Sequence, residues 1–162
     1  MGKRTFPEAP WITADGFLDI TKLPLEGNYK MALNPNRKKA CDSLKVLQLA
    51  TSHGRAEASV FLMGLLASLP PEDWEMRSAA ADALRFTHTE RCAALLFSEL
   101  QRVKCTNTTR SYINTILDVL QSFPANLVRD KSEALADDPS FSYRMGQKFR
   151  RLTDPEHGMD PW

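Results

Sequence analysis

The sequence predicts an all-α protein in which successive helix pairs stack into a short solenoid. One observation is a pattern of an arginine followed by apolar residues three and seven positions later. It occurs at Arg37, Ala40 and Leu44, at Arg77, Ala80 and Leu84, and at Arg110, Ile113 and Leu117. A second observation is that four apolar positions recur 34 residues later: Phe61, Leu62, Leu66 and Leu69 correspond to Leu95, Leu96, Leu100 and Val103. Repeats of this length are typical of stacked helix pairs that each contact only their neighbours.

The third observation is a helical period of apolar residues from Asn36 onward, interrupted by turn signals. Helices are expected near residues 37–52, 56–69, 73–87, 90–104, 108–122, 126–136 and 140–152. The breaks coincide with His53-Gly54, with Pro70-Pro71, and with residues 87–90, whose Thr-His-Thr-Glu sequence predicts a capping box between Thr87 and Glu90. This division gives three helical hairpins and one additional helix. The hairpins are 37–52 with 56–69, 73–87 with 90–104, and 108–122 with 126–136, and the additional helix is 140–152.

Residues 1–35 are expected to form an N-terminal arm or cap, because they contain four of the ten prolines and no sustained helical period. The Asp15-Gly16 pair between two short apolar segments predicts a β-hairpin with a type I′ turn, which requires positive backbone angles at both positions. We interpret the large apolar residues of this hairpin as a cover for the end of the solenoid; they are Trp11, Phe17 and Ile20. The alternative is an extended arm that reaches a partner.

Two consecutive segments resemble a HEAT repeat of the short bacterial type, as found in the phycobilin lyases. They are EMRSAAADAL at residues 75–84 and TERCAALLFSEL at residues 89–100. The resemblance implies a short right-handed α-solenoid over residues 36–152, in which small residues such as Ala80 let a first helix pack closely on a leucine-rich second helix. It implies a scaffold or binding surface and transfers no catalytic residue. Residues 153–162, with two prolines and three acids, are expected to form an extended tail.

Composition narrows the function classes further. The chain has 162 residues and a formal net charge of +1, so nonspecific attraction to nucleic acid or membranes is weak and a charged partner must be recognised by a local patch. Cys41, Cys92 and Cys105 lack the spacing of a disulfide framework. A membrane-spanning helix needs about 18 consecutive apolar residues, and no segment of this sequence comes close to that length. We therefore expect a cytoplasmic protein that has no membrane contact.

Residues suited to catalysis or cofactor binding are scarce. The three histidines are His53, His88 and His157, and none is expected beside a nucleophile. His88 and Cys92, four residues apart, would bind zinc only with two further ligands, and the alternative is a turn histidine with a buried thiol. No glycine-rich phosphate loop is present. We expect no enzyme activity and no catalytic, cofactor-binding or metal-binding residue.

Two basic clusters lie in the first and last predicted helices, and the first contains Arg37, Lys38, Lys39 and Lys45. The second contains Arg150 and the residues Arg144, Lys148 and Arg151, whose spacings of four and three place them on one helix face. Each cluster is either a solvated face or a patch for acidic protein or nucleic-acid phosphate. Tyr143 and Phe149 would suit base stacking, but we prefer the interpretation that both pack in the core. The candidate partner-binding residues are Arg37, Lys38, Lys39, Arg144, Lys148, Arg151 and Trp162.

Trp162 is included because a tryptophan in an acidic tail can anchor in a pocket of a partner. The leading functional hypothesis is a non-enzymatic protein–protein interaction module or assembly subunit, for example an antitoxin or immunity protein. One alternative is a nucleic-acid-binding protein, by analogy with HEAT-like DNA glycosylases. A third is an enzyme similar to the phycobilin lyases.

Overall fold

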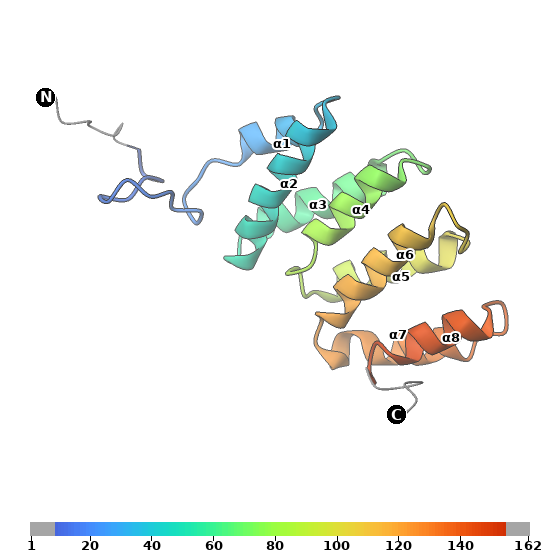
Figure 1. Cartoon of the computed structure of the whole chain (residues 1–162). Helices are drawn as coiled ribbons and strands as arrows, with labels where there is room; N and C mark the ends of the chain where they lie inside the picture. The colour runs from blue at the N-terminus through green and yellow to red at the C-terminus, as the bar shows by residue number, and fades with distance from the viewer. Residues whose placement is uncertain (1–8, 155–162) are drawn as a thin grey trace, which may run out of the picture.

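The computed structural model describes residues 9–154, and within this range it contains eight helices and no strand (Figure 1). The helices are α1 (Glu26–Ala32), α2 (Arg37–Ser52), α3 (Ala56–Ser68), α4 (Trp74–Ala83), α5 (Glu90–Arg102), α6 (Arg110–Gln121), α7 (Ala125–Ala136) and α8 (Tyr143–Arg150). The predicted all-α class is confirmed. None of these eight helices has the length and apolar character needed to cross a membrane.

The helices follow one another as packed pairs, from α1 and α2 at the top of Figure 1 to α7 and α8 at the bottom. Close backbone packing joins α1 to α2, α3 to α4, α5 to α6 and α7 to α8. Of the pairs predicted from the sequence, α2 with α3 is closely packed, whereas α4 with α5 and α6 with α7 are not. The prediction omitted α1, which packs closely on α2. The helices α2, α4 and α6 also lie side by side, with α4 in the middle.

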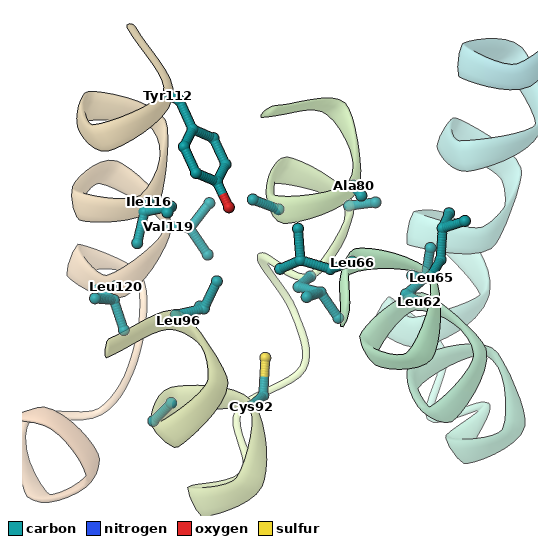
Figure 2. Packing of buried hydrophobic residues seen from close by; sticks show 14 of the residues in the cluster. Leu62, Leu65, Leu66, Ala80, Cys92, Leu96, Tyr112, Ile116, Val119 and Leu120 are labelled. Atoms are coloured by element: carbon teal, nitrogen blue, oxygen red, sulfur yellow. The ribbon is translucent and has the colours of Figure 1, made fainter. Parts of the chain in front are cut away.

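Most of the positions that recur in the sequence are buried in the structure. The apolar members of the arginine pattern are all buried: they are Ala40, Leu44, Ala80, Leu84, Ile113 and Leu117. Leu62 and Leu66 of α3 match Leu96 and Leu100 of α5, and all four are fully or almost fully buried. Figure 2 shows Leu66, Leu96 and Tyr112 directed into the same interior from α3, α5 and α6. The repeat in the sequence therefore records a repeated packing surface.

Side-chain caps start several helices where the sequence predicts a break. Asn36 accepts a hydrogen bond from the backbone N–H of Lys39, and Asp73 accepts one from Met76. The predicted capping box between Thr87 and Glu90 is wrong. Thr89 is the N-cap residue of α5 and accepts from the Cys92 N–H at 3.1 Å, because it is the threonine immediately before the helix.

The helix α1 was not predicted, and it lies inside the segment expected to be an arm. Its sequence, EGNYKMA, contains a glycine and an asparagine, has only seven residues, and lacks a side-chain N-cap hydrogen bond. Such a segment has little intrinsic tendency to form a helix. Packing supplies the missing stability: Leu25 and Ala32 are buried, and the Tyr29 ring stacks on Phe61 of α3 with centroids 4.3 Å apart.

The turn at Asp15-Gly16 forms, but it is not the predicted type I′ turn. Gly16 has a φ of 82°, whereas no non-glycine residue in the described range has a positive φ. The Gly16 N–H donates to the Thr13 carbonyl, the Thr13 N–H donates to Phe17, and one antiparallel bridge joins Ile12 to Leu18. This is the pattern of a three-residue loop whose last residue is left-handed, which requires only one glycine.

The N-terminal residues predicted as a cover divide into two groups. Ile20 is buried, and Arg55 holds the chain there by donating to the carbonyls of Ile20 and Leu23 at 2.9 and 2.6 Å. Phe17 is 72% exposed, and the hairpin lies apart from the helices in Figure 1. Trp11 is half-buried. The cover therefore consists of Ile20 and the helix α1, and Phe17 does not contribute to it.

A buried arginine in α4 joins that helix to both of its neighbours in the chain. Arg77 is 3% exposed, and its Nη1 donates to the Leu66 carbonyl at 2.8 Å and to the Leu69 carbonyl at 3.4 Å. These carbonyls lie at the C-terminal end of α3, where positive charge is favourable. The Arg77 Nη2 atom lies 3.6 Å from Glu99 Oε1 of α5.

Glu99 extends this network to α6. Its Oε2 atom accepts hydrogen bonds from the Tyr112 hydroxyl and from Arg102 Nη2, each at 2.7 Å. Tyr112 is fully buried, and its ring lies 5.5 Å from that of Trp74 at the start of α4. Buried charged and hydroxyl groups are costly without partners, and in this network Arg77 Nε is buried without a hydrogen bond while the other groups are bonded across helices. The network therefore constrains α3, α4, α5 and α6 together.

The replacement Arg77→Met is expected to lower the free energy of unfolding by about 1–3 kcal/mol, because it removes one of the two cations that pair with Glu99 and leaves the buried Leu66 carbonyl without its donor. Arg37→Met is the matched control at the same position of the repeat, where the ion pair with Asp73 is exposed and contributes about 1 kcal/mol or less. Urea unfolding followed by circular dichroism measures both. Equal losses for the two variants would contradict the structural role of the buried network.

Glu99 also makes the free energy of unfolding depend on pH. Burial alone would raise the pKa of Glu99, but hydrogen bonds from Arg102 and Tyr112 and the Arg77 charge outweigh it, so this pKa lies below its ordinary value of 4.5. A depressed pKa stabilises the fold above pH 4.5, and the contribution is lost as the pH falls through the lower, folded-state pKa. The stability difference between the wild type and Glu99→Gln should therefore shrink below about pH 4.5 in urea titrations. A difference that is constant between pH 7 and pH 3 would refute this.

Candidate functional site

A groove lies between α6 and α8. Although α4 packs closely on both α2 and α6, the next helix in this row, α8, packs closely on α7 instead. The resulting groove has a volume of about 510 Å³. It is lined by Arg110 at the start of α6 and by Tyr143, Arg144, Gln147, Lys148 and Arg151 of α8 and its C-terminal end. Four of these six residues are cationic and none is acidic.

The packing of α8 determines which of its side chains face the groove. Phe149 is fully buried and meets Phe141 edge to face, with ring centroids 5.0 Å apart. A Cβ atom on Gly146 would lie 3.2 Å from the carbonyl oxygen of Ala136, so the glycine permits a close approach of α8 to the end of α7. This apolar side is held against α7 and the core, and the basic side is directed to the groove.

The structure brings together three of the candidate residues, Arg144, Lys148 and Arg151, and adds a fourth cation that sequence reasoning missed. Arg110 belongs to the preceding helix pair and lies 34 residues before Arg144. The sequence did contain a signal for Arg110, because this residue begins the third copy of the arginine pattern. We considered that position only as part of the packing repeat.

Two of the cations have neutral amides as neighbours. Lys148 Nζ donates to Asn114 Oδ1 at 3.2 Å, and Arg110 Nη2 donates to Asn107 Oδ1 at 3.1 Å; both amides are neutral. Asp118 lines a larger hollow that shares Arg110 with the groove and a smaller one that shares Lys148 and Arg151 with it, and its carboxylate binds Arg85 at 2.7 Å. The groove is therefore a positively charged cavity with neutral hydrogen-bonding groups.

The first basic cluster has a different environment. Arg37 Nη1 lies 2.8 Å from Asp73 Oδ1 and 3.7 Å from Glu75 Oε2, so it joins the start of α2 to that of α4. The hydrogen bond from Arg37 lowers the pKa of Asp73. Lys38 and Lys39 are exposed on α2, in the pair of helices farthest along the row from α8. The two basic clusters are thus far apart in the structure, and Arg37 forms ion pairs with acidic residues beside its own cluster.

Other residues near the second cluster also have defined positions. Arg150 binds Asp137 of the α7–α8 connection at 2.9 Å and is not among the residues lining the groove. The core interpretation is correct for Phe149 and wrong for Tyr143, whose side chain is 84% exposed because it begins α8 on the solvent side. Trp162 lies outside the described residues.

The groups considered for metal binding are engaged in packing. His88 Nε2 lies 2.9 Å from the Arg85 carbonyl, and the imidazole contacts the Phe123 ring at 4.8 Å. Cys92 is fully buried, and burial raises its pKa to about 12. Residues 9–154 contain no group of three or more His, Cys, Asp or Glu side chains arranged to hold a metal ion.

Comparisons with protein-family models, with curated proteins and with solved structures found no match for this chain.

The three cysteines should react with thiol reagents in a fixed order. Cys105 is exposed, Cys41 is half-buried, and Cys92 is buried with a raised pKa. Because the thiolate is the reactive form, Ellman's reagent at pH 8 should modify Cys105 first and Cys92 only on unfolding. Mass spectrometry of partly modified protein identifies each site. Early modification of Cys92 in folded protein would contradict its burial among α3, α4 and α5.

Proposed function

We propose that this protein is a non-enzymatic, HEAT-like helical-repeat module that binds an acidic segment of a protein partner in the α6–α8 groove. The observation that carries the proposal is the convergence of Arg110, Arg144, Lys148 and Arg151 on one cavity, which no acidic side chain lines among residues 9–154.

A solenoid architecture is part of this proposal. It is supported by the packing of consecutive helix pairs, by the row formed by α2, α4 and α6, and by the equivalent burial of the repeated positions. In this interpretation α1 closes the first end of the stack and residues 9–25 form the arm. The other end, where α8 departs from the row, is the one that exposes a binding surface.

The charge distribution favours a local, multivalent interaction. The formal net charge is only +1, so the groove differs strongly from the rest of the surface. A single exposed ion pair contributes about 1 kcal/mol or less. A partner that places several carboxylates in the groove at once makes several such contacts and is steered to it electrostatically.

One observation favours a second candidate function. Tyr143 combines an exposed aromatic ring with neighbouring cations, which is the arrangement that binds single-stranded nucleic acid by stacking and phosphate contacts. We favour an acidic protein segment because the groove offers one such ring, whereas extended stacking platforms use several. Both ligands are compared in the experiment below.

We also propose a cytoplasmic location. Cys41, Cys92 and Cys105 are all unpaired in the structure, which is typical of proteins in a reducing compartment.

Reversing two groove charges, Arg144→Glu with Lys148→Glu, should weaken binding of a fluorescein-labelled oligoglutamate peptide at least about tenfold, because two attractive contacts become repulsive. Fluorescence anisotropy at low ionic strength measures the affinity. Added salt should weaken binding to the wild type, since the contacts are exposed.

The matched control is Lys38→Glu with Lys39→Glu, which changes the net charge equally at the other basic cluster and should leave the affinity within about twofold. Equal losses for both double variants would show that net charge, not the groove, governs binding and would refute the proposal. A single-stranded oligonucleotide of the same charge that binds more tightly than the peptide, and loses affinity in Tyr143→Ala, would instead support nucleic-acid binding.

A further inference from the structure

A second cleft opens on the other side of the first turn of α8. It has a volume of about 500 Å³ and lies between the chain that leaves α5 and the connection from α7 to α8. Its lining consists of Gln101, Arg102, Val103, Lys104, Cys105, Ser140, Phe141, Ser142 and Met145. The two clefts share no lining residue, but Arg144 of the first is adjacent in sequence to Met145 of the second.

The chemistry of this second cleft differs from that of the α6–α8 groove. Val103 and Met145 are buried and Phe141 is half-buried, so these three residues give the cleft an apolar floor. Arg102 and Lys104 are exposed at its rim, where Arg102 also binds Glu99 at 2.7 Å, and none of the nine described residues that line the cleft is acidic. An apolar floor beneath a cationic rim complements a large apolar side chain that has carboxylates nearby in its own chain.

We propose that the second cleft receives one large apolar side chain of the same acidic segment that occupies the α6–α8 groove. The inference rests on the proposed function and specifies the partner: an acidic run with a tryptophan, phenylalanine or leucine beside it. The carboxylates meet Arg110, Arg144 and Lys148, and the apolar residue enters the cleft above Phe141 and Met145.

Geometry sets the spacing between the two parts of this segment. A helix with its side chains is about 10 Å across, and an extended chain advances about 3.3 Å per residue. The segment must cross the first turn of α8, so the apolar residue should lie about three or four positions from the nearest carboxylate. Tyr143, at the point of crossing, has an exposed ring on which the backbone of the segment can lie.

The first test compares labelled peptides of equal charge: one oligoglutamate, and two that carry a tryptophan four residues before or after the glutamates. One of the tryptophan peptides should bind at least about tenfold more tightly than the plain peptide, because burial of a large apolar side chain is worth that factor or more. Binding of both tryptophan peptides within twofold of the plain one would overturn the inference.

The second test blocks the cleft through Cys105, which lines it and is exposed. In a Cys41→Ser background, modification with N-phenylmaleimide should place an uncharged ring in the cleft. The tryptophan advantage should then fall to within about twofold, and the affinity for the plain peptide should be unchanged. The Cys41→Ser, Cys105→Ser protein, treated with the same reagent, is the control and should keep the full advantage.

The outcomes separate this inference from the proposed function. In one outcome, the plain peptide binds through Arg144 and Lys148 while the tryptophan peptide keeps its higher affinity after modification of Cys105. That result would refute the proposed role of the second cleft and leave the proposed function intact. Absence of binding by any of the peptides would overturn the proposed function and the inference with it.

Discussion

The buried ion pair between Arg77 and Glu99 is the interaction on which the rest of the structure depends. Arg77 binds the last carbonyls of α3, and Glu99 binds the hydroxyl of Tyr112 on α6. Burying both charges is unfavourable unless every helix that supplies a partner is in place. The network therefore favours one arrangement of α3, α4, α5 and α6, and the alanines of α4 allow that arrangement to be close.

This arrangement also determines where the candidate site can form. Tyr112 holds the start of α6, and Arg110 lies two residues earlier, at the mouth of the groove. At the next position of the row, Gly146 and Phe149 draw α8 onto α7, and the space that closer packing with α6 would fill remains open. The basic side of α8 then faces Arg110 across a cavity. The groove is thus a consequence of two packing preferences, one in the centre of the stack and one at its end.

The sequence predicted the structure correctly where the spacing of apolar or basic residues follows the helical period. The arginine pattern and the 34-residue recurrence identified the buried faces of α2 to α6, and the i, i+4, i+7 spacing grouped Arg144, Lys148 and Arg151. It failed where long-range packing overrides local preference. The helix α1 has poor local signals, is stabilised by Tyr29 on Phe61, and packs closely on α2. Arg110 and the cleft around Cys105 depend on contacts between segments far apart in the chain, which no spacing rule reveals.

The central claim is that the groove between α6 and α8, and not the other basic cluster, receives an acidic chain. The most direct measurement is a titration of ¹⁵N-labelled protein with an oligoglutamate peptide, followed by heteronuclear NMR. Saturable shifts are expected only for the residues around Arg110, Asn114, Arg144 and Lys148, with the signals of α2 unchanged. Shifts centred on Lys38 and Lys39, or shifts spread over all exposed basic residues, would contradict it.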